Sequence, residues 1–428
     1  MLQVTAVKEN FENFVNGLKK RGIQNAEEQL NELIQLDDER KKTQQSLDDI
    51  LANSNLLAKK IGQLYKEGKK EEADAAKAET SQLKEESKQL GEVLSSIENQ
   101  LLEKLYSIPN IPNPLVPAGK SEADNEVVKL EDKNLPALYA GAKPHWDLIT
   151  EYDIIDFDLG NKVTGAGFPF YKREGARMVR SLVNYFLDEA QQAGYMEVQP
   201  PILINEESGY GTGQLPDKEG QMYGITGTNL YLIPTAEVPI TNIYRDVILD
   251  AGSLPVKNVG YTPCFRREAG SWGAHVRGLN RLHQFDKVEI VQIAHPDQSY
   301  EILDGMVAHV EHLVKSLGLP YRILRLCGGD LGFTSAITYD FEVYSAAQEK
   351  WLEVSSVSNF ETYQANRLKL RFKDKDGKKV LAHTLNGSAL AVPRILAALL
   401  ENNQTEVGIL IPEVLRQYTG FDMIKSLK

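Results

Sequence analysis

The chain has 428 residues, of which 42% are apolar, so it is long enough for two domains and for a sizeable buried core. Its two cysteines, Cys264 and Cys327, are too few for a disulfide framework, and the sequence contains neither an apolar leader nor an apolar run of membrane-helix length. These features exclude a disulfide-rich secreted scaffold and predict a cytoplasmic protein with no membrane partner. The net charge of -12 argues against nucleic-acid binding through bulk electrostatics, but a local basic face is compatible with it.

Residues 27–105 have the composition of long exposed helices, because they are rich in Glu, Lys, Gln and Leu and contain no proline. A seven-residue repeat runs on both sides of a break at 67–70. Its a and d positions are Leu33, Leu36, Arg40, Thr43, Leu47, Ile50, Ser54, Leu57, Ile61 and Leu64 before the break, and Leu83, Ser87, Leu90, Leu94, Ile97 and Leu101 after it. The pattern predicts an antiparallel coiled-coil hairpin about 55 Å long. An oligomerisation coiled coil is the alternative interpretation.

The segment 108–114 contains three prolines, which end the second helix and form a stiff linker. We therefore predict an N-terminal helical arm over 1–107 and a globular domain over 108–428. In the globular part, the patterns predict a helix over 171–193 and strands over 195–198, 229–233, 258–265, 282–293, 321–326, 339–344 and 351–355. Strands joined mostly by loops indicate an α+β domain with an antiparallel sheet flanked by helices.

The segment 265–268 (Phe-Arg-Arg-Glu) falls at the end of a predicted strand. Side chains two apart on a strand share a face, so Arg266 and Glu268 are expected to reach one ligand together. An arginine suits a phosphate, and a second arginine, Arg394, follows on a late predicted helix. Since no Gly-rich phosphate loop occurs, these residues favour a nucleoside triphosphate held without one. A surface ion pair is the alternative for an isolated Arg-x-Glu.

Five segments occur in a fixed order downstream of the predicted hairpin. They are 235–237 (Thr-Ala-Glu), 265–271 (Phe-Arg-Arg-Glu-Ala-Gly-Ser), 283–289 (His-Gln-Phe-Asp-Lys-Val-Glu), 353–356 (Glu-Val-Ser-Ser) and 383–388 (His-Thr-Leu-Asn-Gly-Ser). Together they resemble the bacterial type of seryl-tRNA synthetase, a class II aminoacyl-tRNA synthetase, over essentially the whole chain. The unit ending at Pro201 is similar to the dimer-forming motif 1 of this class, the Arg-x-Glu strand to motif 2, and a helix opened by Gly387 and carrying Arg394 to motif 3.

The resemblance implies that the enzyme activates L-serine with ATP and Mg²⁺. Arg266 would stabilise the α-phosphate, Glu268 would accept from the adenine amine, and Phe285 and Arg394 would sandwich the purine. Without the resemblance, core packing is the simpler interpretation of Phe285, and a solvated strand carboxylate that of Glu353. The implied ATP set is Arg266, Arg267, Glu268, Leu282, Phe285, Glu353, Val354, Ser355, Ser356 and Arg394. Arg266, Glu353 and Arg394 would be catalytic, and Glu353 and Ser356 would hold Mg²⁺.

The resemblance also implies a pocket for serine. Thr235, Ala236 and Glu237 would lie at its α-amino end, and Glu289, Ser388 and Asn386 at its hydroxyl. A site that bonds a hydroxyl rejects alanine, because its buried polar groups would be left unpaired, whereas threonine must be excluded by size.

The implied partners are serine tRNA and a second copy of the chain. The arm would grip the tRNA, and lysines gather toward its predicted tip: Lys59, Lys60, Lys66, Lys69, Lys70, Lys77 and Lys84. The sequence 274–276 (Ala-His-Val) departs from the family, so contacts of that loop with the acceptor end stay open. The sequence also leaves open which tRNA nucleotides are contacted, whether the arm is ordered without tRNA, and whether selenocysteine tRNA is a substrate.

Two alternatives remain at this stage. A ligase that loads an amino acid onto a carrier protein would share the catalytic domain but lack the long arm. A coiled-coil scaffold with an inactive domain would have lost an Arg or Glu of the ATP set, and none is missing here.

Overall fold

The computed structural model describes residues 1–133, 135–268 and 277–426. These form two compact units, one of residues 1–19 and 23–109 and one of residues 20–22 and 110–428.

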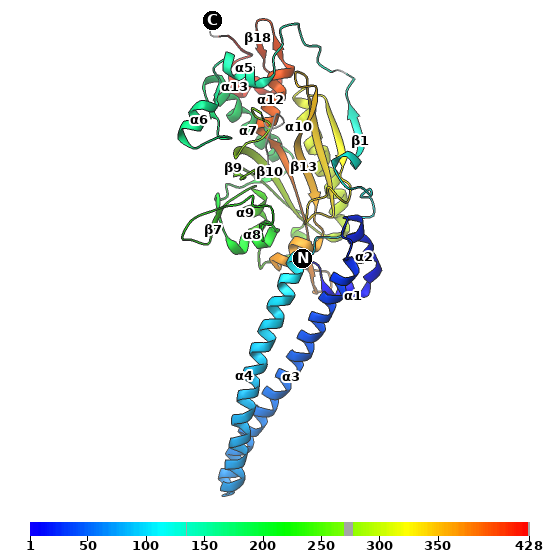
Figure 1. The fold of residues 1–428 in the computed structure, drawn as a ribbon, viewed down its shortest axis with the longest axis vertical. Helices are drawn as coiled ribbons and strands as arrows, with labels where there is room; N and C mark the ends of the chain where they lie inside the picture. Colours follow the sequence, from blue (N-terminus) through cyan, green and yellow to red (C-terminus); the bar gives the residue numbers. More distant parts are fainter. Residues whose placement is uncertain (134, 269–276, 427–428) are drawn as a thin grey trace. The chain divides into compact units, whose positions relative to one another are not determined.

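The first unit is helical and consists of α1 (Val4–Glu9), α2 (Phe11–Lys20), α3 (Ala26–Lys66) and α4 (Lys70–Ser107) (Figure 1). Helices α3 and α4 form the predicted antiparallel hairpin, roughly 60 Å long at 1.5 Å per residue. At its base Lys104 forms an ion pair with Glu32, and near its tip the Tyr65 hydroxyl donates to Asp74 over 2.7 Å. Every predicted a and d position is buried or half-buried, whereas Leu51 and Leu56, outside the repeat, are exposed. The heptad reading is therefore confirmed.

The second unit is built on a mixed, mostly antiparallel sheet of eight strands in the order β1-β11-β12-β13-β16-β10-β9-β4. The strands are β1 (Glu126–Glu131), β4 (Met196–Glu197), β9 (Val256–Phe265), β10 (Gln284–Ala294), β11 (Tyr321–Arg325), β12 (Ile337–Ser345), β13 (Lys350–Asn359) and β16 (His383–Ala391). Only the edge pair β4 and β9 is parallel among the strands described in this sheet. The α+β prediction is confirmed.

Helices α7 (Arg173–Gln192), α10 (Ser299–Ser316) and α12 (Val392–Asn402) pack on this sheet and make the main core (Figure 1). Met178, Leu182 and Phe186 recur at helical spacing on α7, and all three are buried. Burying this apolar stripe ties α7 to β9, β10 and α12. Within the described residues, no helix has both the length and the apolar character that crossing a membrane requires.

The remaining elements surround the sheet. They are α5 (His145–Glu151), β2 (Ile155–Asp156), α6 (Phe157–Val163), β3 (Phe170–Tyr171), β5 (Leu203–Asn205), α8 (Glu206–Thr212), β6 (Tyr223–Gly224), β7 (Leu230–Leu232), α9 (Glu237–Asn242), β8 (Ile248–Asp250), α11 (Thr362–Leu368), β14 (Arg371–Lys373), β15 (Lys379–Leu381), β17 (Gln404–Thr405), β18 (Gly408–Leu410), α13 (Glu413–Thr419) and β19 (Met423–Ile424).

Two local predictions are wrong. Strand β9 ends at Phe265, where its ladder with β10 also ends, so Arg266 and Glu268 lie beyond the strand, and Glu268 has a φ of 49°. The alternation argument for these two side chains therefore does not apply. Likewise Gly387 opens no helix, because it pairs with Ile290 inside β16. The helix that carries Arg394 begins at Val392, with Pro393 in its first turn.

Candidate active site

Most of the predicted site residues converge on the middle of the large sheet. Strands β13, β16, β10 and β9 are consecutive neighbours there, and each either carries a predicted residue or ends beside one. Thr235 and Glu237 come from the start of α9, which packs on β10.

One end of the site is a cluster of buried polar side chains around Glu289. This residue, 2% exposed, lies opposite Ser388 in the β10–β16 ladder, and the Ser388 hydroxyl donates to its carboxylate over 3.4 Å. Lys287 bridges this polar cluster, since its ammonium lies 2.8 Å from the Glu289 carboxylate and donates to the Thr235 hydroxyl over 2.9 Å. The cluster therefore brings together one ammonium, one carboxylate and the hydroxyls of Thr235 and Ser388.

Glu237 interacts with the charges of this cluster and has an unusual ionisation. Burial, followed by repulsion from the Glu289 carboxylate, raises the pKa of Glu237 to about 7. The Gln364 amide donates to Glu237 over 2.7 Å. The side-chain amide nitrogen of Asn386 is buried nearby; it faces Glu237 and opposes the rise in that pKa, but it makes no hydrogen bond of ordinary geometry among the described residues. A buried donor left unmatched costs free energy, so this group is suited to a polar ligand.

Arg266 lies beside the aromatic ring of Phe285. Its guanidinium carbon is 5.2 Å from the ring centroid, its Nε donates to the Pro234 carbonyl over 3.3 Å, and its backbone N–H donates to the His283 carbonyl over 2.9 Å. Phe285 is itself half-buried and packs against the main core, so the core-packing interpretation also holds in part. Arg266 is thus fixed between the strand ends of β9 and β10.

Arg394 and Glu353 lie together on the same part of the sheet. Arg394 donates from Nη1 to the Glu353 carbonyl over 2.6 Å, and the same atom lies 3.9 Å from the Glu353 carboxylate. Its Nε donates to the carbonyl of Asn280 over 2.8 Å. The segment from Asn280 to Phe285 therefore contacts both arginines, and the structure brings Arg266, Glu353 and Arg394 into one neighbourhood.

A β-bulge explains how Glu353 and Ser356 act from one face although they are three residues apart. The β12–β13 register pairs Asp340 with Ser356 and Glu342 with Glu353, which leaves Val354 as the extra residue. Burial and the Glu353 charge raise the pKa of Asp340 well above its usual range. The Asp340 Oδ1 atom is buried and has no partner among the described residues. Three oxygen-bearing side chains, one of them with an unmatched buried oxygen, fit a hard cation such as Mg²⁺.

Other predicted residues are placed differently. Leu282 and Val354 belong to the main core and Ala236 to a smaller one, so their side chains serve packing and only their backbones are open to a ligand. The Ser355 hydroxyl donates to the Ser388 carbonyl over 2.5 Å. Arg267 is exposed, and Glu268 forms an ion pair with Arg281. The predicted departure at 274–276, with the rest of 269–276, lies outside the described residues.

Comparisons with known proteins match this arrangement. The seryl-tRNA synthetase N-terminal domain model matches residues 1–112, and the tRNA synthetase class II core domain (G, H, P, S and T) model matches residues 225–403. The serine–tRNA ligase of Salinibacter ruber is 48% identical over 99% of both chains. The chain belongs to the seryl-tRNA synthetase family. A second family member, from Carboxydothermus hydrogenoformans, is 45% identical over 99% of both chains.

A solved structure of the seryl-tRNA synthetase family shares this fold over its whole length. The Pyrococcus horikoshii enzyme, complexed with ATP, has a TM-score of 0.91 and 33% identity and covers 100% of both chains. The predicted family and fold class are therefore confirmed.

Sequence reasoning missed three residues of this seryl-tRNA synthetase site. Lys287 is two residues before Glu289 on one strand, so the period-two rule could have found it. Gln364 and Asp340 had no such signal. Gln364 meets Glu237 across 127 residues of sequence, and Asp340 joins Glu353 only through the bulge.

Proposed function

We propose that this protein activates L-serine with ATP and transfers the seryl group to the 3′ end of serine tRNA. The observation that carries the proposal is the placement of Arg266 and Arg394 around the segment 280–285, which leads directly into the part of β10 where Lys287 and Glu289 form the polar cluster. A site for a nucleotide and a site for a small polar amino acid are therefore neighbours along one stretch of chain, 280–289.

The first step needs no side-chain nucleophile. The serine carboxylate attacks the α-phosphorus of ATP, the bond to the bridging oxygen breaks, and pyrophosphate leaves while seryl-adenylate forms. Arg266 would stabilise the charge that develops on the α-phosphate, and Arg394 with Phe285 would hold the purine between them. In the second step the 3′-hydroxyl of the terminal adenosine attacks the seryl carbonyl and AMP leaves. Positioning and charge stabilisation account for catalysis.

Pyrophosphate exchange tests this function against the carrier-protein ligase. We expect serine to stimulate exchange of labelled pyrophosphate into ATP, and alanine and glycine to do so at least about a hundred-fold less efficiently, because Glu289 and Ser388 would lose their hydroxyl partner. Charging of serine tRNA completes the assay. Stronger exchange with alanine or glycine would instead favour the carrier-protein ligase.

Glu237 makes serine binding depend on pH. In this proposal its carboxylate, with Thr235 beside it, receives the serine ammonium, and it must be ionised to do so. Because its pKa is raised to about 7, the KM for serine should rise as the pH falls through 7, by up to roughly ten-fold per pH unit. Steady-state exchange assays between pH 6 and 8 would measure this. Glu237→Gln should give a high KM that no longer varies with pH.

The same ionisation gives an independent check on the substrate-free protein. A carboxyl whose folded-state pKa lies above its unfolded value stabilises the fold while protonated, and this contribution is lost as pH rises through the folded pKa. The free energy of unfolding should therefore fall between pH 4.5 and 7, and Glu237→Gln should flatten this change. An unaltered pH profile of both KM and stability in Glu237→Gln would contradict the assignment.

Mg²⁺ is part of the proposal. Glu353 and Ser356 would hold it, and the unmatched oxygen of Asp340 supports a cation at this position. When bound, Mg²⁺ would neutralise charge on the ATP phosphates. The chain's own contribution is to present these side chains on one face through the bulge at Val354.

The helical arm is proposed as the tRNA-binding part, with residues 1–107 as the arm and 108–428 as the catalytic domain. The seven lysines toward its tip are all exposed, so they are accessible to phosphates. A cytoplasmic location completes the proposal; both cysteines are free thiols, which suits a reducing compartment.

We also propose that the chain is a homodimer that associates near Pro201. Around this residue Met196, Ile202 and Leu203 are 58%, 38% and 40% exposed, and β4 is an edge strand. Replacing Ile202 and Leu203 together by Glu should raise the dimer dissociation constant by at least about a hundred-fold, because charges would be buried in the interface. Sedimentation equilibrium would measure it.

The opposite edge of the sheet supplies a matched control. Leu130 on β1 is 48% exposed, so Leu130→Glu places the same charge on the other edge strand and should leave the dimer intact. Dissociation caused by Leu130→Glu, with no effect of the double variant, would place the interface at β1 instead.

A further inference from the structure

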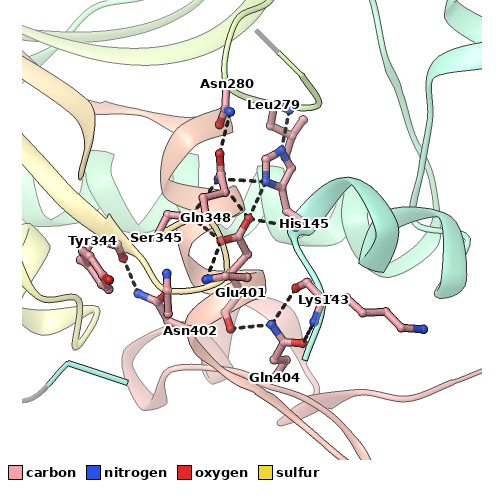
Figure 2. A network of polar contacts seen from close by, with 12 residues as sticks. Lys143, His145, Leu279, Asn280, Tyr344, Ser345, Gln348, Glu401, Asn402 and Gln404 are labelled. Atoms are coloured by element: carbon pink, nitrogen blue, oxygen red, sulfur yellow. Dashed lines mark hydrogen bonds and ion pairs between the residues drawn. The ribbon is translucent and has the colours of Figure 1, made fainter. Parts of the chain in front are cut away.

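A fully buried histidine and glutamate lie away from the proposed substrate contacts. His145 on α5 and Glu401 on α12 are both 0% exposed. The His145 Nδ1 atom lies 2.7 Å from Glu401 Oε1, and the His145 backbone N–H donates to the same oxygen over 2.9 Å (Figure 2). The other carboxylate oxygen accepts from the Ser345 hydroxyl and from the Ala347 backbone N–H. Every oxygen of this buried carboxylate is therefore matched.

The second ring nitrogen of His145 defines its protonation state. The Leu279 backbone N–H donates to His145 Nε2 over 2.9 Å. A nitrogen that accepts a hydrogen bond carries no proton, so Nε2 is the acceptor and Nδ1 is the atom that donates to Glu401. His145 thus connects a fixed carboxylate on α12 to the backbone of the segment that begins at Arg277.

Gln348 makes a second connection to the same segment. Its amide nitrogen donates to Glu401 Oε1 over 3.0 Å and to the Ser345 hydroxyl over 2.8 Å, and its carbonyl accepts from the Asn280 amide over 2.8 Å (Figure 2). Leu279 and Asn280 are therefore held from two directions by one buried network. Asn280 in turn presents its backbone carbonyl to Arg394 Nε at 2.8 Å.

We propose that His145 is a positioning residue for ATP binding: through Leu279 it fixes the Asn280 carbonyl, which orients the guanidinium of Arg394. This inference rests on the proposed role of Arg394 at the purine. The contacts support a specific role for the Nε2 atom in addition to packing, because Nδ1 and Nε2 face different partners. Nδ1 serves the buried carboxylate, whereas Nε2 serves the segment that reaches Arg394.

Gly278 shows how closely this contact is built. A Cβ atom at Gly278 would lie 2.3 Å from His145 Nε2, and the residue has a φ of 67°. Only glycine brings the backbone this near to the ring without strain. Gly278→Ala should therefore push the segment away from His145, although no side chain of the network is itself replaced.

Two substitutions of His145 distinguish the roles of its two ring nitrogens. His145→Asn keeps an amide donor where Nδ1 lies, so Glu401 stays paired, but it offers no acceptor to Leu279. His145→Gln places its amide oxygen where Nε2 lies, so it keeps the acceptor and gives up the side-chain bond to Glu401. We expect His145→Asn to raise the ATP KM in serine-dependent exchange by roughly ten-fold or more while the serine KM changes less than about two-fold. Gly278→Ala should do the same.

His145→Gln should keep the ATP KM near that of the unaltered enzyme and lower the melting temperature instead, because the buried carboxylate loses a partner. His312→Asn is the control: His312 also pairs with a glutamate, its Nε2 lying 2.9 Å from Glu189, but at an exposed position on α10, and its loss should change neither quantity. Calorimetric titration with ATP would give the binding change independently of turnover.

An unchanged ATP KM in both His145→Asn and Gly278→Ala would overturn the inference. So would equal increases in His145→Asn and His145→Gln, because the histidine would then serve packing alone. Arg394→Ala separates the positioning role of His145 from the proposed role of Arg394 in binding ATP. If Arg394→Ala also leaves the ATP KM unchanged, the role of Arg394 fails; if only Arg394→Ala raises it, the positioning role of His145 fails by itself.

Discussion

Replacing Arg266 by alanine should lower the rate of serine-dependent pyrophosphate exchange by roughly a hundred- to a thousand-fold, the range typical for loss of one preorganised donor to transition-state charge. The effect should appear in kcat, with a smaller change in the ATP KM, since the charge on the α-phosphate is greatest as the new bond forms. Steady-state exchange with varied ATP would separate the two parameters.

The structure explains why lysine should not rescue this position. Arg266 uses its Nε to bond the Pro234 carbonyl and lays its planar group 5.2 Å from the Phe285 ring centroid. A lysine has one charged atom and no planar fork, so it cannot make both contacts and also reach a phosphate. We therefore expect Arg266→Lys to recover less than about a tenth of the original activity.

A matched control tests whether any sheet arginine has this effect. Arg325 on β11 pairs with Glu126 at the edge of the same sheet, far along the strand order from β9. Arg325→Ala should leave exchange within about two-fold, because partly exposed ion pairs contribute little. Activity of Arg266→Ala close to that of Arg325→Ala would rule out Arg266 as the phosphate ligand.

Periodicity was the reliable part of the sequence signal. The heptad positions predicted the buried seam of the α3–α4 hairpin, and the alternating runs predicted most strands of the large sheet. Both depend on local repetition, which a single sequence displays. Strand β16 escaped this reasoning because its residues, from Thr384 to Leu390, are buried on both faces and so do not alternate.

The site was harder to predict from the sequence, because its geometry depends on where the regular strand pairing ends or is interrupted. Arg266 and Glu268 were expected on a strand, but the ladder ends at Phe265, just before both of them. Glu353 and Ser356 share a face only because a bulge at Val354 changes the register, and a bulge leaves no mark in residue spacing. The His145 network joins four segments distant in sequence. Taken one at a time in the sequence, the residues of this network look like ordinary polar residues. Only the fold shows that they contact one another.

Removing the outer part of the helical arm should abolish charging of serine tRNA, by roughly a hundred-fold or more, while serine-dependent exchange continues at its normal rate. The reason is that the proposed chemistry lies entirely in the second unit. The contacts Glu32–Lys104 and Tyr65–Asp74 define the register of the hairpin, which places Thr43 opposite Leu94. Deleting residues 44–93 and joining the ends with the natural turn sequence of 67–70 preserves this register.

The shortened chain keeps the anchoring contacts of the second unit. Arg21 donates to the Asn110 carbonyl over 2.6 Å and to the Leu331 carbonyl over 2.8 Å, and the deletion leaves all three residues in place. Exchange activity therefore also reports that the catalytic unit is folded. Loss of both activities would indicate a folding defect, and normal charging by the shortened chain would show that the arm does not bind tRNA.

Charge variants of the intact arm separate phosphate binding from shape. Replacing the seven tip lysines by Gln should raise the KM for tRNA and make charging less sensitive to salt, because a phosphate that meets no lysine keeps its counterion when the tRNA binds. Lys41 and Lys42 provide the control, since they lie in α3 nearer its base and Lys41 is already paired with Asp37 over 2.8 Å. Their replacement by Gln should leave the salt dependence unchanged. Equal effects of the two sets would mean that net charge, and not the tip, governs binding.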